Sequence, residues 1–363
     1  AGICPVRGHS NVQGQRTVGI AEKVGLVPLD RLALQYGFEP PRKDGMNTVE
    51  VCEAVVEGRV RAFIGLGGNF VRAIPERELM EEKWRGLDVC VQIATKLNRA
   101  HLVTAKTTYL LPTLVRSEID TQAGGPQIVT MEDSTTCIHA SHGKFDPAAD
   151  SLLSEPKIVA ELAKALLPPN PLVPWDDWVA DYGRVRDAIE ATFPDQFRDF
   201  NGRLDIPGGF PRPVAARDRQ WETESGKANF HCPAGLSASF DDDTDVDVLR
   251  LITLRSNDQF NTTVYGMSDR LRGINGSRMV VMMNRDDRIR LGLADEGPVR
   301  LVTAVEDGRH RSMGGFQVID YDLPPGTCAS YFPECNALIP LWHFAEGSKT
   351  PAAKSVPVRV FRD

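Results

Sequence analysis

Apolar residues in the first part of the chain occur in two patterns, one with the spacing of a helix and one in short continuous runs. Segment 47–58 has helical spacing, with Asn47 and Glu50 placed as a capping box and Gly58 at the expected end. Other segments predict helices at 74–86, 154–167 and 178–193, and strands at 59–69, 87–95 and 107–112. Helices that alternate with apolar strands predict β-α-β units and a parallel sheet.

The pattern changes near residue 248. Short apolar runs at 248–256, 278–284 and 297–304 predict strands, and Asp307-Gly308 predicts a hairpin turn. Short strands with tight turns and one small helix predict a compact β-barrel. Prolines at 167–175 and an acidic run at 240–247 mark expected boundaries. The predicted domains are therefore an α/β domain at 1–170, a connecting region at 171–247 and a barrel at 248–363.

Composition narrows the class of protein. The chain has 363 residues, enough for two domains, and a net charge of −7, which argues against a nucleic-acid partner. It contains no run of about 18 apolar residues, so no membrane span is expected. Seven scattered cysteines, without a Cys-x-x-Cys pair, favour reduced thiols in a cytoplasmic protein over a disulfide framework, a zinc site or an iron–sulfur site. The histidines show no metal-ligand spacing, so no metal ligand is assigned.

Two candidate sites follow predicted strands. The first is Gly67-Gly68-Asn69, whose backbone could approach a phosphate closely; a tight strand–helix turn is an equal alternative. The second comprises Thr95, Lys96 and Asn98. Ligands bind beyond the carboxyl ends of parallel strands, so both sets are expected along one crevice, although a lone lysine is usually a surface charge.

Two further sets lie in the predicted barrel. A dense run of hydrogen-bonding side chains suits a polar heterocycle with a phosphate, although a polar hairpin loop is the commoner explanation. That run contains Arg255, Ser256, Gln259, Asn261 and Thr262. Asn336 and Lys354 are additional candidate ligand contacts, whereas Cys335 is interpreted as structural.

Taken in order, these segments resemble the C-terminal portion of bacterial molybdopterin oxidoreductase alpha subunits, most closely the formate-dehydrogenase-like group. The resemblance covers essentially the whole chain and is carried by a series of motifs in register. They are "GICPVRGHSNVQG" at the start, "GLGGN", "ATKLNRAH", "WETESGKANF", "LRSNDQFNTT" and the closing "KTPAAKSVPVRV".

The resemblance implies an α/β domain with a parallel, dinucleotide-binding-like sheet, followed by a double-psi β-barrel. It also implies molybdenum held by two molybdopterin guanine dinucleotides (bis-molybdopterin guanine dinucleotide). One guanosine diphosphate would contact the residues of the first two sets. The barrel residues, with Asn336 and Lys354, would contact the pterins and phosphates. Arg7 matches the arginine beside the metal and could hold a small anion such as formate, while His9 replaces a glutamine of some relatives.

The family also needs a 4Fe-4S cluster and a molybdenum ligand, which the resemblance places in an N-terminal portion upstream of residue 1. The chain is therefore expected to be part of a larger subunit and to need that portion for turnover. Possible partners are iron–sulfur or NAD-reducing subunits. One alternative is a non-catalytic scaffold subunit of an electron-transfer complex. Another is a nicotinamide dehydrogenase, against which the missing Gly-x-Gly-x-x-Gly counts.

Overall fold

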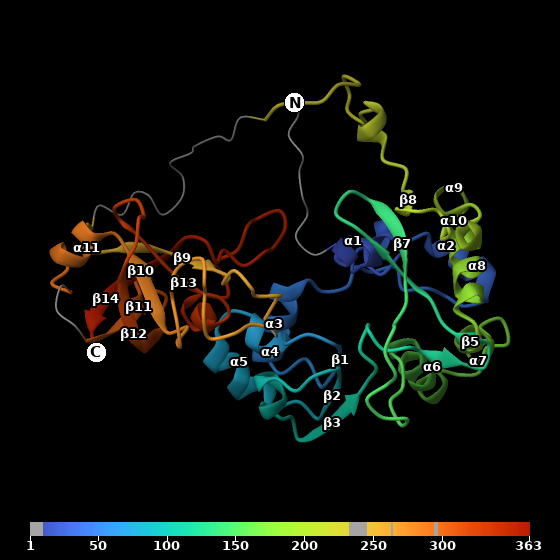
Figure 1. The fold of residues 1–363 in the computed structure, drawn as a ribbon, viewed down its shortest axis with the longest axis horizontal. Coiled ribbons are helices and arrows are strands. Elements are labelled where there is room, and N and C mark those ends of the chain that lie inside the picture. The colour runs from blue at the N-terminus through green and yellow to red at the C-terminus, as the bar shows by residue number, and fades with distance from the viewer. Residues whose placement is uncertain (1–9, 232–244, 263, 294–296) are drawn as a thin grey trace. The chain divides into compact units, whose positions relative to one another are not determined.

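The computed structural model describes residues 10–231, 245–262, 264–293 and 297–363. The chain divides into two compact units, each built from two separate stretches (Figure 1). Unit 1 comprises 1–45 and 112–231, and unit 2 comprises 46–111 and 232–363. The expected segment 1–170 is thus shared between the units, and boundaries near 170 and 247 stay predictions.

Unit 2 begins with a small α/β layer. Its strands form a sheet in the order β1-β2-β3, in which β1 and β2 are parallel as predicted. The capping box at Asn47 and Glu50 is present. The elements are α3 (Thr48–Val56), β1 (Ala62–Leu66), α4 (Phe70–Ala73), α5 (Arg77–Trp84), β2 (Val89–Ala94), the 3₁₀ turn η2 (Arg99–Leu102) and β3 (Thr107–Pro112). Val55, Met80, Trp84 and Cys90 share one core, so the helices α3 and α5 cover this sheet.

The second stretch of unit 2 forms a closed six-stranded barrel, drawn from orange to red in Figure 1. The strand order is β10-β12-β11-β14-β9-β13, with both parallel and antiparallel neighbours. A closed barrel was predicted, and its double-psi topology stays a prediction. The elements are β9 (Leu249–Leu254), β10 (Val280–Met283), α11 (Arg285–Arg290), β11 (Pro298–Thr303), β12 (Ser312–Asp320), β13 (Thr327–Tyr331), η5 (Glu334–Leu338) and β14 (Val356–Arg362).

The apolar core of the barrel explains why its strands form a closed sheet. Residues on β9, β11 and β14 alternate inward, and Leu251, Leu301 and Val358 are fully buried together. In the closed barrel each strand pairs with a neighbour on both sides, so the barrel lacks the exposed edge strands of an open sheet. Asp307-Gly308 lies in the loop 304–311 that joins the antiparallel strands β11 and β12, and Gly308 has a positive φ of 77°. The predicted hairpin is therefore confirmed, with a connection longer than a two-residue turn.

Unit 1 carries short helices and two small sheets around an aromatic core of Phe197, Phe200 and Phe210. The helix predicted at 178–193 is in fact two helices, because Asp181 leaves the helical conformation and caps the second through Gly183 N at 2.8 Å. The elements are α1 (Ser10–Thr17), η1 (Val24–Leu26), α2 (Leu29–Tyr36), β4 (Thr121–Gln122), β5 (Gly125–Pro126), β6 (Val129–Glu132), β7 (Cys137–Ser141), α6 (Glu155–Leu166), α7 (Trp175–Ala180), α8 (Tyr182–Thr192), α9 (Pro194–Phe197), α10 (Phe200–Arg203), β8 (Phe210–Pro211) and η3 (Ala215–Asp218). Among the described helices, none combines the length and apolar character needed to cross a membrane.

Candidate functional site

Strand β1 ends in two glycines whose backbone is open on one side. Gly67 and Gly68 have φ values of 70° and 80°, a left-handed conformation that favours glycine. A Cβ atom built on either residue would meet no heavy atom within 4 Å. The Asn98 amide Nδ2, which follows β2, donates to the Gly68 carbonyl oxygen at 3.1 Å. The ends of β1 and β2 are therefore tied together, with free space beside the glycines.

Asn69 connects this end of the sheet to the barrel. Its side chain is buried, and Nδ2 donates to the carbonyl oxygen of Thr262 at 3.1 Å. The other amide atom, Oδ1, has no hydrogen-bond partner in the described part of the chain. A buried acceptor without a partner is costly, so an additional donor is expected here.

A pocket of about 210 Å³ lies at this junction, inside unit 2. Its lining includes three of the predicted residues, Asn69, Asn98 and Thr262. The complete lining is Asn69, Arg72, Leu97, Asn98, Arg99, Thr262, Tyr265, Pro333 and Glu334. The volume is below that of pockets for drug-sized ligands, so the pocket suits one part of a larger molecule.

Two guanidinium groups, those of Arg72 and Arg99, line the pocket together with the carboxylate of Glu334. Arg72 is paired with Glu81, and its backbone carbonyl accepts a hydrogen bond from Asn336 Nδ2 at 3.3 Å. Asn336 is buried, and its Oδ1 is the second acceptor beside the pocket without a partner among the described residues. Arg99 lines the pocket from the first position of η2. Amide and guanidinium groups of this kind bind phosphates and polar heterocycles.

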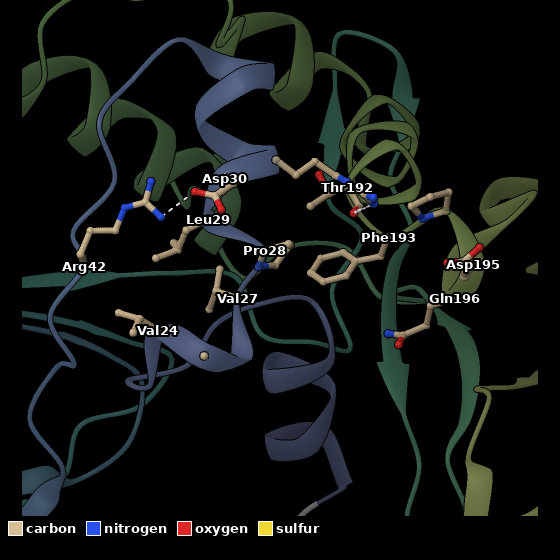
Figure 2. Close-up of a pocket in the computed structure, with 13 residues that line it drawn as sticks. Val24, Val27, Pro28, Leu29, Asp30, Arg42, Thr192, Phe193, Asp195 and Gln196 are labelled. Atoms are coloured by element: carbon tan, nitrogen blue, oxygen red, sulfur yellow. Dashed lines mark hydrogen bonds and ion pairs between the residues drawn. The ribbon is translucent and has the colours of Figure 1, made fainter. Parts of the chain in front are cut away.

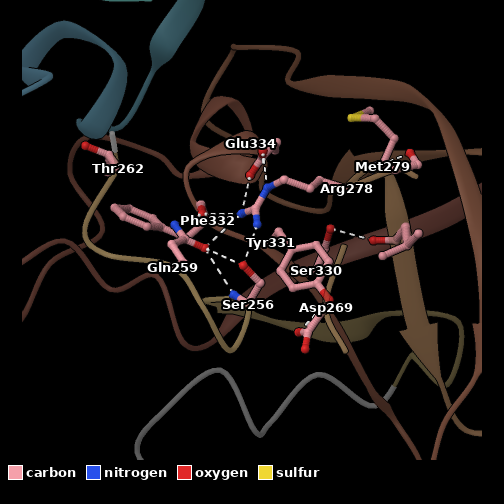
Figure 3. A network of polar contacts seen from close by, with 12 residues as sticks. Ser256, Gln259, Thr262, Asp269, Arg278, Met279, Ser330, Tyr331, Phe332 and Glu334 are labelled. Carbon is pink, nitrogen blue, oxygen red and sulfur yellow. Dashed lines mark hydrogen bonds and ion pairs between the residues drawn. The ribbon is translucent and has the colours of Figure 1, made fainter. Parts of the chain in front are cut away.

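A buried arginine that the sequence analysis did not single out holds the barrel side of the pocket (Figure 3). Arg278 contacts Ser256 Oγ at 2.8 Å and Gln259 Oε1 at 2.9 Å, so these two predicted residues are bound to the protein itself. It also pairs with Glu334 at 2.7 Å. The only sequence signal was an arginine directly before the apolar run 279–283, where a buried charge needs a partner.

Tyrosine rings cover Arg278 on two sides. Its guanidinium carbon lies 4.1 Å from the ring centre of Tyr265 and 4.5 Å from that of Tyr331. Burial, and secondarily the charge of Glu334, raises the pKa of Tyr265. Tyr331 donates its hydroxyl hydrogen to Asp269 at 2.9 Å, and burial raises its pKa as well. Both phenols are therefore protonated at neutral pH, and their uncharged rings pack against the guanidinium of Arg278.

Arg255 and Lys354 form a second cationic group on the barrel. The Lys354 ammonium donates to the Thr253 carbonyl oxygen, and Arg255 lies over the Phe332 ring at 5.8 Å. Burial first, and then the like charge of Arg255, lowers the pKa of Lys354. An anion that binds next to both cations would offset the repulsion between them.

The remaining predicted residues are distributed as follows. Thr95 and Lys96 are exposed beyond the end of β2 and are not part of the pocket lining. Asn261 precedes Thr262 and has a left-handed φ of 54°. Arg7 and His9 lie outside the described residues. In the described ranges, no group of three or more histidine, cysteine or acidic side chains could hold a metal ion.

The buried thiols are not nucleophiles. Burial raises the pKa of Cys52 to about 12 and that of Cys335 to about 12. Cys90 is buried in the core under the sheet, and burial raises its pKa too. A thiolate is the reactive form, so these cysteines serve as core residues.

Unit 1 has a separate cavity of about 700 Å³, in which none of the predicted site residues lies (Figure 2). An exposed ion pair between Arg42 and Asp30, 2.7 Å apart, stands at one side. Phe193 and Pro28 line it, and Arg31 Nη1 donates to the Thr192 carbonyl oxygen at 2.6 Å. Gln196, another lining residue, donates from Nε2 to the Thr17 carbonyl oxygen at 3.2 Å.

The barrel and its pocket match a known type of domain. A family model described as "Molydopterin dinucleotide binding domain" matches residues 249–357, which span β9 to the start of β14. Residues 249–357 therefore match the molybdopterin dinucleotide-binding domain family, which supports the resemblance of the sequence motifs to molybdopterin oxidoreductases.

Particular relatives are similar along the whole chain. The protein YdeP of Escherichia coli K12 is 44% identical over 366 residues, covering 99% of this chain and 47% of that protein. An uncharacterized oxidoreductase of Mycobacterium tuberculosis is 43% identical over 373 residues, covering 99% of this chain and 46% of its own length. The chain therefore spans about half the length of these curated relatives.

Among solved structures, acetylene hydratase from Pelobacter acetylenicus has a similar fold. The TM-score is 0.57 at 15% sequence identity, covering 96% of this chain and 52% of that one. At this identity the similarity concerns the fold alone.

Proposed function

We propose that unit 2 binds the guanine dinucleotide part of a molybdopterin cofactor at the junction of the β1–β2 strand ends and the barrel. The observation that carries the proposal is the meeting of Asn69 and Asn98 with Thr262 in one pocket. These residues come from three predicted sets, and Thr262 lies more than 150 positions along the chain from Asn69 and Asn98. The match of the barrel to a dinucleotide-binding family supports the same ligand.

The residues present fit such a ligand. The buried oxygen of Asn69, a residue of the pocket lining, has no donor in the described ranges, and a nucleobase or ribose would supply one. The open backbone at Gly67 and Gly68 allows close approach of a diphosphate. Arg72 and Arg99, like the second cationic group at Arg255 and Lys354, provide positive charge for phosphates. We also propose the bis-molybdopterin guanine dinucleotide form of the cofactor and the double-psi topology of the barrel, both of which the resemblance of the sequence motifs implies.

For the full-length protein we propose a molybdenum-dependent oxidation of a small substrate, formate first. The bound cofactor supplies the two-electron chemistry, and the residues of this chain bind and orient it. The permanent charge of the Arg7 guanidinium suits a small anion, a role inferred from the resemblance of the opening segment. A 4Fe-4S cluster in the part of the protein outside this chain, with iron–sulfur or NAD-reducing partners, would accept the electrons. The cytoplasmic location expected from the cysteines stays a prediction.

The test is the composition and activity of the full-length protein after expression with molybdate. We expect molybdenum and pterin to copurify, and formate to reduce an artificial electron acceptor. Absence of both metal and pterin would overturn the proposal and favour the scaffold alternative. If metal and pterin copurify but formate is not oxidised, formate is rejected as the substrate and the proposed cofactor is retained. Arg7→Lys keeps the charge and loses the planar fork, so a higher KM for formate is expected.

A further inference from the structure

We propose that Arg278 is a positioning residue that preforms the nucleotide pocket without touching the nucleotide. This inference rests on the proposed function of the pocket. Arg278 is 2% exposed and is absent from the pocket lining, whereas Glu334 and Tyr265, which it contacts, both line the pocket. The side chain can therefore act on a ligand only through its neighbours.

The contacts of Arg278 join two loops that form the barrel side of the pocket (Figure 3). On one side Nη1 donates to Ser256 Oγ at 2.8 Å and Nη2 to Gln259 Oε1 at 2.9 Å. Gln259 in turn donates to the carbonyl oxygen of Asn261 at 2.7 Å, directly before Thr262. The segment that presents Thr262 to the pocket is thereby fixed.

On the other side the guanidinium holds the loop after β13. Nη2 donates to the Phe332 carbonyl oxygen at 2.9 Å. Nε and Nη2 reach the two carboxylate oxygens of Glu334 at 2.7 Å and 3.1 Å. This two-point contact fixes the plane of the carboxylate, which a lysine ammonium cannot do. The ring of Tyr265, 4.1 Å from the guanidinium, is held by the same group.

These contacts assign Arg278 a role in affinity because a preformed site does not need to be ordered when the ligand binds. If Glu334, Thr262 and Tyr265 had to be ordered by the nucleotide, part of the binding free energy would be lost. The contribution is expected to appear as weaker nucleotide binding in a variant that keeps the positive charge.

The experiment uses the full-length protein produced in a host that makes no molybdopterin, with GDP as the probe in isothermal titration calorimetry. We expect Arg278→Lys to weaken GDP binding by about tenfold, the scale expected when one or two side chains must be ordered on binding. Arg288→Lys is the matched control. Arg288 belongs to the same barrel, pairs with Asp320 at 2.9 Å and does not line the pocket, so its variant should bind GDP as the parent does.

Two further variants separate positioning from general stability. In a Glu334→Gln background, Arg278→Lys should weaken GDP binding by clearly less than tenfold, because the contact through which it acts is already weakened. Ser256→Ala removes one contact of Arg278 and replaces Arg278→Lys in the test if that variant does not fold. About threefold weaker GDP binding is expected, because fewer groups would need to be ordered on binding.

The outcomes are distinct. A lower melting temperature of Arg278→Lys with unchanged GDP affinity would overturn the inference, since the role would then be structural only. An equal loss of GDP affinity in Arg288→Lys would overturn the inference as well. Failure of the parent protein itself to bind GDP would instead reject the proposed nucleotide site, and the role of Arg278 with it.

Discussion

The side chain of Asn69 donates to the carbonyl oxygen of Thr262 across 193 positions of sequence. One residue ends the turn after β1, and the other lies in a loop of the barrel. Their contact joins the two halves of unit 2 at the pocket. Asn69 is buried, and its Oδ1 has no hydrogen-bond partner among the described residues, so this oxygen is the atom that the proposed nucleotide would meet.

The turn beside this contact provides a first test. Gly68→Ala introduces a side chain at a φ of 80°, where a Cβ meets open space but the backbone is strained. We expect a loss of about 1 kcal/mol in unfolding free energy, together with weaker GDP binding, because the methyl group occupies the space beside the pocket.

Gly58→Ala is the matched control for this variant. Gly58 has a φ of 72°, also with no atom near a Cβ, but it follows α3, whereas Gly68 accepts a hydrogen bond from the pocket residue Asn98. It should lose similar stability in urea unfolding and keep its GDP affinity. Equal affinity losses in both variants would show that the effect of Gly68→Ala comes from backbone strain and not from its place in the site.

Local sequence patterns predicted the elements that position the site. The capping box at Asn47, the parallel pair β1–β2 and the hairpin at Asp307-Gly308 follow from short-range rules. They could be predicted because each depends on residues within a few positions. The break at Asp181 was missed because apolar spacing continues through it, while the cap is made by one side chain.

The network behind the pocket could not be predicted in the same way. Arg278 and Glu334 are 56 positions apart, and their pairing depends on how the barrel closes. Similarly, the sequence analysis interpreted Ser256 and Gln259 as ligand contacts because their side chains can form hydrogen bonds to a polar ligand. Only the fold shows that their polar atoms are already bound to Arg278.

A second test concerns a buried ion pair that links α5 to the barrel. Glu76 accepts a hydrogen bond from Arg311 Nε at 3.0 Å, and both side chains are almost fully buried. Glu76→Gln should reduce unfolding free energy by about 2 kcal/mol, since a charged hydrogen bond is weakened while Asp307 still pairs with Arg311. Glu78→Gln, on the exposed side of the same helix, should be neutral in the same urea titration. A neutral Glu76→Gln would show that the pair contributes no net stability.

A third test is the acid sensitivity of unit 1. Asp133 contacts His139 Nε2 at 2.7 Å, and its pKa is lowered to about 2. Burial alone would raise this pKa, but hydrogen bonds from His139, Cys137 and Thr135 together outweigh it. An unfolded aspartate titrates near pH 3.9, so the stabilisation is complete above about pH 4 and is lost as the pH falls toward 2.

Asp133→Asn should therefore lower stability at pH 6 by about 1 kcal/mol, a value reduced for solvent screening of a partly exposed carboxylate. The difference from the parent protein should disappear near pH 2. Urea unfolding at the two pH values measures it, with the exposed Asp150→Asn as control. A stability difference that is the same at both pH values would contradict the assigned pKa.

A fourth test concerns Glu132, the buried carboxylate that holds α1. It accepts hydrogen bonds from Thr17 Oγ1 at 2.6 Å and Gln13 Nε2 at 3.1 Å, and it lies near Arg212 at 3.4 Å. Glu132→Gln keeps the volume but removes the charge, so α1 should open more often, by about 1 to 2 kcal/mol in opening free energy. Hydrogen exchange of amides 10–17 in the full-length protein measures this opening. Unchanged exchange in Glu132→Gln would show that the helix is held mainly by its close backbone contact at Gly14, where a Cβ would come within 3.2 Å of Glu132 Cβ.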